Sequence, residues 1–135
     1  VKDVDFGHHQ LQIWNGKGYH HRLTTLAPEL APLLQSQVER VRLVLREDSR
    51  HPQYAGVWMP DALARKYREA GKTVGWQYLF PAARLAVDTD SGLLRRHHID
   101  ESNINRFLRR AAQQARIDKR ITCHTLRHCF ATHLL

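Results

Sequence analysis

Apolar residues recur at steps of three and four positions in three stretches of the chain, a spacing that predicts amphipathic helices. The first stretch, residues 29–47, follows Pro28 and keeps Pro32 in its first turn. The second, residues 101–117, has Asp100 as a predicted N-cap, and the third begins after Thr122. The apolar positions along these helices are Leu30, Leu34, Val38, Val41 and Leu45, then Ile104, Phe107, Leu108, Ala111 and Ala115, then Leu126, Phe130 and Leu134, with this last set expected to face inward.

Shorter patterns occupy the rest of the chain. Apolar residues on both sides of the tetrapeptide NGKG (15–18) predict a β-hairpin over residues 11–26 with Lys17 at its tip. Residues 61–72 predict a short helix closed by Gly71, and residues 75–82 predict a brief aromatic strand or extended piece. Residues 49–60 and 83–98 have loop composition. The expected fold class is therefore α+β, mainly helical, with a small antiparallel sheet near the N-terminus.

Length and composition fit one globular domain. The chain has 135 residues, of which 42% are hydrophobic and 25% are charged. No apolar run approaches the roughly 18 residues that span a bilayer, and the first ten residues lack a signal-peptide pattern, so we expect a cytoplasmic protein with no membrane partner. Cys123 and Cys129 lie six residues apart on one predicted helix, which disfavours a disulfide between them and suggests reduced, half-buried thiols.

The charge balance points to a polyanionic partner. Lysine and arginine number 21 against 13 aspartate and glutamate residues, which gives a formal net charge of +8. Such an excess favours salt-sensitive binding to a polyanion, and DNA is the first candidate. A merely basic protein with no nucleic-acid partner is the alternative on charge alone.

Three polar residues lie within about one turn of the last predicted helix. His124, Arg127 and His128 can converge there on one ligand. Arginine offers a planar fork of donors suited to phosphate, and histidine can donate a hydrogen bond or move a proton near neutral pH. Two alternatives stay open. His124 and His128 have the spacing of a zinc pair, although Thr125 stands where such motifs carry glutamate, and all three residues could be purely structural.

Two sequence boxes resemble those of the tyrosine site-specific recombinases of the phage integrase family. HTLRHCFATHLL (124–135) is similar to the H-x-L-R-H-x-F-A-T-H-L-L box, and NGKGYHHR (15–22) is similar to the G-K-G-x-K-x-R hairpin. Between them, GWQYLFPA, DTDSGLLRRHHIDESNINRFLRRAA and KRITCHTLRH resemble the integron integrase subgroup. The resemblance covers nearly the whole chain.

That resemblance implies a tyrosine recombinase catalytic-domain fold, truncated at both ends. Residues 1–27 would form the β-hairpin region, and residues 28–99 would form helices together with the extra segment of the integron type. Residues 100–135 would form helices that carry the H-x-L-R-H box.

The resemblance also implies an activity, namely site-specific recombination of DNA through a 3′-phosphotyrosyl link, with no metal and no cofactor. His124 and Arg127 match residues that hold the scissile phosphate, Lys17 matches the general acid on the leaving 5′ hydroxyl, and His128 matches a supporting position. The first arginine of the family has no match in this sequence. Its nucleophilic tyrosine has no match either, because all four tyrosines precede the H-x-L-R-H box. We therefore expect an internal fragment of the parent enzyme that is inactive alone.

The implied substrates are gene-cassette sites folded from single-stranded DNA, with a few bases extruded from the stack, and the implied partners include other integrase protomers. Residues that match or border base-stacking positions are Trp14, Trp76, His97 and His98. Arg95 and Arg96 would add phosphate-binding charge beside the histidines. Core tryptophans, a solvated histidine loop and a solvated turn lysine at position 17 are the alternatives.

Two departures from the subgroup bear on the substrate. Thr89 stands where the subgroup usually has proline, and His20 and His21 replace the more usual Lys-Asp after the hairpin tip. A rival interpretation is a non-catalytic nucleic-acid-binding module, in which basic residues in 38–50 and 100–120 hold phosphates. A third is a domain that binds a metal through its ten histidines.

Overall fold

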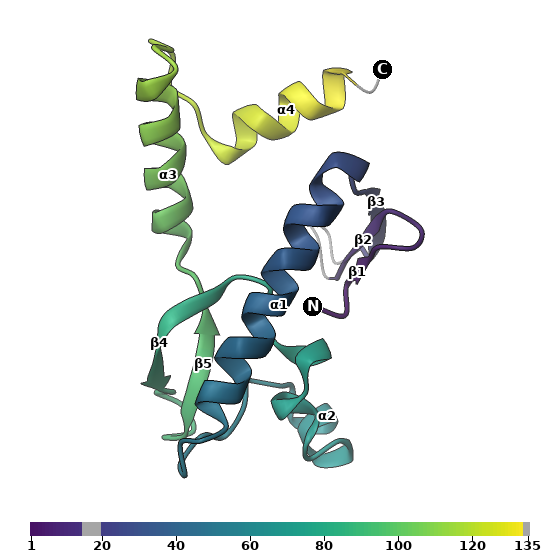
Figure 1. Cartoon of the computed structure of the whole chain (residues 1–135), viewed down its shortest axis with the longest axis vertical. Helices are drawn as coiled ribbons and strands as arrows, with labels where there is room; N and C mark the ends of the chain where they lie inside the picture. Colours follow the sequence, from purple (N-terminus) through teal and green to yellow (C-terminus); the bar gives the residue numbers. More distant parts are fainter. Residues whose placement is uncertain (15–19, 134–135) are drawn as a thin grey trace. The chain divides into compact units, whose positions relative to one another are not determined.

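The computed structural model describes residues 1–14 and 20–133. It divides into two compact units, Val1–His98 and Ile99–Leu135, and each unit is described by itself (Figure 1). Within the described residues there are four α-helices and two small antiparallel sheets. This confirms the predicted α+β class.

The first unit begins with a three-stranded antiparallel sheet. Strands β1 (Val4–Asp5), β2 (Gln10–Ile13) and β3 (Arg22–Thr25) lie in the order β1-β2-β3, and β2 pairs with β3 from Gln10 opposite Thr25 to Ile13 opposite Arg22. The predicted strands of the hairpin are thus confirmed. Its predicted tip, with Lys17, lies outside the described residues.

The long helix α1 (Ala31–Asp48) follows a 3₁₀ turn at Pro28–Leu30, and Pro32 lies in its first turn as predicted. Its buried side chains include Val38, Val41 and Leu45, at the predicted steps of three and four. Leu30 lies in the preceding turn and is exposed, so the predicted stripe holds only for the later turns of the helix.

Two predictions about the middle of the chain hold only in part. The helix expected over residues 61–72 ends early, as α2 (Asp61–Lys66), and Gly71 lies in a separate 3₁₀ turn, Ala70–Lys72. The carbonyl of Gly71 accepts tertiary hydrogen bonds from the Val57 backbone N–H at 3.0 Å and from Nε2 of Gln77 at 2.8 Å. Residues 75–82, expected as an aromatic strand or extended piece, form no strand before Pro81: Val74–Trp76 is a 3₁₀ turn, and Gln77 after it has extended backbone.

The segment 83–98, predicted as a loop, forms most of a β-hairpin. Strand β4 (Pro81–Val87) pairs with β5 (Leu94–His98), and Leu85 lies opposite Arg96. The turn is closed by the Asp88 N–H, which donates to the Leu93 carbonyl at 2.9 Å. Charged residues on β5 hid the strand pattern, because the inward-facing position of Arg96 is apolar in an ordinary amphipathic strand.

A buried ion pair joins this hairpin to α1. Arg96 donates through Nε to Oδ2 of Asp48 at 2.8 Å, through Nη2 to Oδ1, and through Nη1 to the Ala82 carbonyl at 2.9 Å. Only 9% of the Arg96 side chain and 3% of the Asp48 side chain are exposed. Each charge is therefore screened by its partner instead of by water.

A second buried polar pair lies close to the first. The Tyr54 hydroxyl donates to Oε1 of Gln77 at 3.2 Å, and both residues are buried. Burial, followed by the charge of Asp48, raises the pKa of Tyr54 to about 12. The phenol therefore stays protonated and keeps its donor role at neutral pH.

The second unit consists of α3 (Glu101–Gln114) and α4 (Cys123–His133). Asp100 caps α3 as predicted, since its Oδ1 accepts the Ser102 N–H at 2.8 Å, and Thr122 caps α4 by accepting the Thr125 N–H at 3.2 Å. No described residue of either helix is buried, so the expectation that Leu126 and Phe130 face inward was wrong. Two helices alone cannot enclose a core. Cys123 and Cys129 are free thiols and exposed, not half-buried.

We predict that Asp48→Ala lowers the free energy of unfolding by about 3–5 kcal/mol, because it leaves the Arg96 charge buried without a partner. The matched control is Glu47→Ala, which removes an exposed carboxylate that pairs with Arg50 at 3.1 Å and should cost no more than about 1 kcal/mol. Urea unfolding of both variants and the wild type measures the difference. Equal losses for the two variants would contradict a stabilising role for the buried pair.

We also predict that Gly56→Ala is more destabilising than Gly92→Ala. Both glycines have positive φ angles, 85° and 68°, so alanine costs about 1–2 kcal/mol at either position. At Gly56 the added Cβ would also lie 2.8 Å from the carbonyl carbon and oxygen of Gly71, whereas at Gly92 it meets open space. The midpoints of urea unfolding should therefore rank wild type, Gly92→Ala and Gly56→Ala, and the reverse order of the variants would refute the close approach.

Candidate nucleic-acid interface

The predicted site residues are divided between the two units. Trp14, Trp76 and residues 95–98 belong to the first unit, and His124 and Arg127 belong to the second. Lys17 lies outside the described residues, so its predicted role stays a prediction.

In the first unit the ammonium group of Lys2 lies close to the rings of both Trp14 and Trp76. Nζ of Lys2 lies 5.5 Å from the centre of the Trp14 ring and 4.9 Å from that of Trp76. The same ammonium and Nε1 of Trp14 both donate to Oδ1 of Asp3, each at 2.8 Å. We call Lys2, Asp3, Trp14 and Trp76 the Lys2 cluster.

The backbone holds the Lys2 cluster together. The Lys2 N–H donates to the Gly75 carbonyl at 2.8 Å, which places the start of the chain beside Trp76. Partial burial acts to raise the pKa of Asp3, but the hydrogen bonds from Lys2 and Trp14 and the charge of Lys2 outweigh it, so the net effect is a lowered pKa. The carboxylate therefore stays ionised and orients both of its donors.

A hollow of about 360 Å³ adjoins the Lys2 cluster. Its lining includes the aromatic side chains of Trp58, Trp76 and Tyr78. Trp14 is 49% exposed, so it is not a core residue, whereas Trp76 is half-buried. His21 lies edge-on to Trp14, with ring centres 4.8 Å apart. Sequence reasoning found both tryptophans but missed Lys2 and Asp3, because only the tertiary hydrogen bond to Gly75 brings them to Trp76.

On β5 the arginines and histidines differ in their surroundings. Arg96 is buried against Asp48, and Arg95 donates through Nη1 to the Val57 carbonyl at 2.9 Å and lies 3.6 Å from Asp88. Both guanidinium groups therefore contact other parts of the unit, and their expected phosphate contacts stay predictions. His97 is half-buried, and His98 is exposed, with its ring edge-on to Tyr78 at 5.3 Å.

The turn between β4 and β5 is ordered by its own polar residues. The Ser91 hydroxyl donates to Oδ2 of Asp88 at 2.5 Å, and this hydrogen bond is the main reason that the pKa of Asp88 is lowered. Thr89, which departs from the subgroup pattern, is exposed in this turn. Its side chain lies at the same end of the hairpin as the ionised Asp88.

In the second unit α4 brings two of the predicted residues into contact. Nε2 of His124 and Nε2 of His128 lie 2.8 Å apart, and the two rings are nearly perpendicular, at 89°. One ring must donate and the other accept, so the pair shares one proton and each ring restrains the other. Arg127 is exposed on the same helix, one turn after His124.

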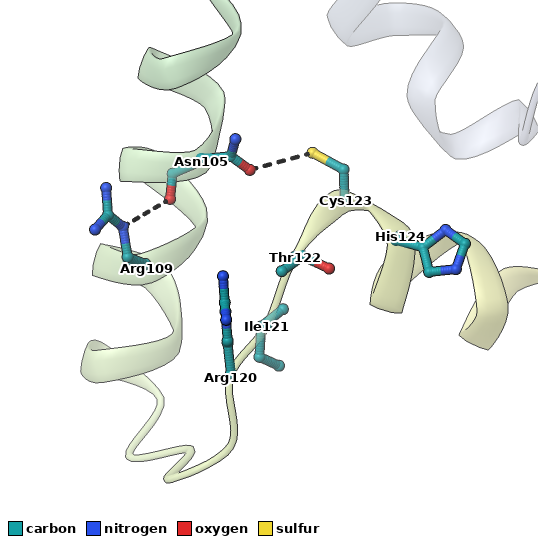
Figure 2. A pocket seen from close by; sticks show the side chains of 7 residues that line it. All are labelled: Asn105, Arg109, Arg120, Ile121, Thr122, Cys123 and His124. Atoms are coloured by element: carbon teal, nitrogen blue, oxygen red, sulfur yellow. Dashed lines mark hydrogen bonds between the residues drawn. The ribbon is translucent and has the colours of Figure 1, made fainter.

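A second hollow, of about 740 Å³, lies between α3 and the start of α4 (Figure 2). We call it the α3–α4 hollow. The residues that line it are Asn105, Arg109, Arg120, Ile121, Thr122, Cys123 and His124. Sequence reasoning treated Arg109 and Arg120 only as part of a basic stretch, because the hollow that both residues line depends on how the two helices are joined.

The described residues contain neither a candidate metal site nor a helix that could span a membrane. Among residues 1–14 and 20–133, no three His, Cys, Asp or Glu side chains are grouped so that they could hold a metal ion, and His124 and His128 meet as a pair only. No helix in the described part of the chain has the length and apolar character needed to cross a bilayer.

Comparison with known proteins indicates the same family as the sequence boxes. The sequence model of the phage integrase family matches residues 1–135, the whole chain. Two relatives, each named "Integrase/recombinase", from Escherichia coli and Pseudomonas aeruginosa, are 42% identical over all 135 residues. The chain spans 40% of the length of each relative. On this match and on the boxes around His124 and Arg127, the chain belongs to the phage integrase family.

Proposed function

We propose that this chain is part of the catalytic domain of a tyrosine recombinase of the integron integrase type, which recombines gene-cassette sites folded from single-stranded DNA. Family membership and the name of the two relatives support recombination chemistry. The observation that supports the choice of substrate is the Lys2 cluster, in which one ammonium group lies close to two tryptophan rings, and Lys2 and Trp76 line a hollow.

In the proposed reaction a tyrosine hydroxyl attacks the scissile phosphate, a 3′-phosphotyrosyl bond forms, and the bond to the 5′ oxygen breaks. Arg127 and His124 would donate hydrogen bonds to the phosphate oxygens, whose negative charge grows in the transition state. Lys17 would give its proton to the leaving 5′ oxygen. His128 would act as a positioning residue, because its contact with Nε2 restrains the His124 ring. The mechanism assigns no step to a metal or a cofactor.

None of the four tyrosines of the chain is the proposed nucleophile. Tyr54 is buried, its hydroxyl donates to Gln77, and its pKa is raised to about 12, so its hydroxyl is a poor nucleophile. Neither Tyr67 nor Tyr78 follows the H-x-L-R-H box, and Tyr19 lies outside the described residues. This chain by itself is therefore predicted to bind its substrate without cleaving it.

The Lys2 cluster suits an extruded base for two reasons. A base that leaves the stack regains stacking energy on an aromatic face, and Trp14 exposes about half of its surface. The Lys2 ammonium lies near both rings and can meet the phosphate attached to that base. His97 and His98 form a second candidate stacking pair on β5.

A second candidate function is a non-catalytic nucleic-acid-binding module. It is favoured by the basic surplus of residues 99–135, where seven lysines and arginines stand against three acidic residues. Such a module would bind through phosphates alone, so its affinity would depend on salt but not on extruded bases.

We predict that the chain binds a cassette-site hairpin with extruded bases more tightly than the fully paired duplex of the same sequence. Trp14→Ala and Trp76→Ala should each weaken hairpin binding about 5- to 150-fold, as expected for about 1–3 kcal/mol of lost stacking. The control is Tyr67→Ala, which removes another exposed aromatic ring that lies 5.2 Å from a lysine, outside the cluster. Fluorescence anisotropy at one fixed salt concentration measures all four proteins. Equal affinity for hairpin and duplex would favour the non-catalytic module.

We further predict that the double variant His97→Ala/His98→Ala loses part of the preference for the hairpin, because the second stacking pair is removed. His51→Ala is the control, since it also removes an exposed imidazole of the first unit. The same anisotropy measurement applies, with hairpins that keep either one or two extruded bases. A double variant that discriminates hairpin from duplex as well as His51→Ala does would remove both histidines from the proposed base contacts.

A further inference from the structure

The imidazole rings of His124 and His128 contact each other through the same nitrogen of each ring. Their Nε2 atoms lie 2.8 Å apart, and the ring centres lie 4.3 Å apart. Two nitrogens at this distance need one hydrogen between them, because two lone pairs or two N–H groups would repel each other. The contact therefore forms only when one ring is the donor and the other is the acceptor.

The hydroxyl groups nearest to His128 along α4 are engaged with other partners. Residues three and four positions apart share a face of a helix, so Thr125 and Thr132 are the neighbours best placed to compete for the His128 ring. The Thr125 hydroxyl lies 3.1 Å from that of Thr122, and the Thr132 hydroxyl donates to the carbonyls of His128 at 3.0 Å and of Cys129 at 2.9 Å. Nε2 of His128 is therefore paired with His124 and not with a neighbouring hydroxyl.

The direction of this hydrogen bond decides which nitrogen of a neutral His124 carries the proton. A neutral imidazole has one N–H group, and its place is set by the hydrogen bond that the other nitrogen makes. If His124 donated from Nε2, its Nδ1 would hold a lone pair, which repels a phosphate oxygen. If His124 accepts at Nε2, its proton lies on Nδ1 and can be donated to a phosphate. For a neutral ring, only the second direction is compatible with both the His128 contact and phosphate binding.

We propose that His128 donates its Nε2–H to Nε2 of His124 and thereby holds His124 in the Nδ1–H tautomer, which donates to the scissile phosphate. This inference rests on the proposed function, because the phosphate contact of His124 is part of it. His128 is thus a positioning residue that acts through His124 and sets the place of its proton as well as the orientation of its ring. Arg127 keeps its donors at every working pH, so of the two proposed phosphate ligands on α4 only His124 needs such a partner.

The test replaces His128 by side chains that can only donate, only accept, or do neither. His128→Lys keeps a donor, His128→Glu offers an ionised acceptor, and His128→Phe offers no hydrogen bond. Lysine and glutamate both favour helices, and far-UV circular dichroism checks that every variant keeps α4. His133→Phe is the matched control, because it removes an exposed imidazole of the same helix that lies outside the pair.

The readout is the nitrogen NMR spectrum of the His124 ring in the full chain without DNA, at a pH above the range in which histidine titrates. Protonated and unprotonated ring nitrogens have well-separated shifts, and loss of signals in His124→Gln identifies this ring. The wild type, His133→Phe and His128→Lys should carry the hydrogen on Nδ1 of His124. In His128→Glu it should move to Nε2, and His128→Phe should lose the preference for Nδ1.

A second arm tests the contact between His124 and the phosphate. Saturation with the cassette-site hairpin should shift the Nδ1–H signal of His124 in the wild type and in His128→Lys, because a phosphate oxygen becomes its acceptor. The signals of His133 serve as the reference within the same spectrum. A His124 signal that does not move in the saturated complex refutes the phosphate contact.

The outcomes separate this inference from the proposed function. A tautomer of His124 that follows the donor or acceptor at position 128 supports the inference. An Nε2–H tautomer in the wild type, or the same tautomer in His128→Lys and His128→Glu, refutes it, and a preference for the hairpin over the duplex would still support the proposed function. If the wild type has the Nδ1–H tautomer but binds hairpin and duplex equally, the donor role of His128 stands and the proposed substrate is wrong.

Discussion

The ion pair between Asp48 and Arg96 joins the end of α1 to the β4–β5 hairpin, and the arrangement of the first unit depends on it. The two residues are 48 positions apart, and neither charge is accessible to water, so each is stable only while the other is in place. Side chains alternate along a strand, so fixing Arg96 against α1 turns Arg95 and His97 to the opposite face of β5. There Arg95 donates to the Val57 carbonyl. One buried pair therefore sets the face of β5 on which His97, one of the two proposed base-stacking histidines, lies.

Gln77 plays a comparable part near the aromatic cluster. Its amide donates to the Gly71 carbonyl, and its Oε1 accepts the hydroxyl of Tyr54, so the segment around it is held from two sides. Trp76 precedes it directly, and the Gly75 carbonyl accepts the Lys2 N–H. The Lys2 cluster is thus built from the start of the chain and from a segment more than seventy residues later. Its position follows from the backbone hydrogen bond between Lys2 and Gly75, from the side-chain hydrogen bonds of Gln77, and from the hydrogen bond that Nε1 of Trp14 donates to Asp3.

The second unit is not held together by buried side chains, because its two helices have no buried residue among those described. Local hydrogen bonds order it instead. Asp100 and Thr122 cap the helices, and the His124–His128 contact restrains a ring on an exposed face. Charge left uncompensated on such a unit is available to a polyanion.

The sequence by itself determined the elements whose signals are local. Apolar residues at steps of three and four predicted α1 and α3, and residue type predicted the caps Asp100 and Thr122. The H-x-L-R-H box placed His124 and Arg127 on one helix. These features depend on residues within about one turn of each other. Tertiary structure alone decided the rest. The sequence did not predict the β4–β5 strands, because the inward-facing Arg96 breaks the alternation of apolar residues. Burial of that arginine is stabilised by Asp48, which comes from the distant helix α1. Lys2 lies beside Trp76 through a hydrogen bond to Gly75 that no local spacing encodes, because the distance between two side chains in space is set by packing and not by their separation in sequence.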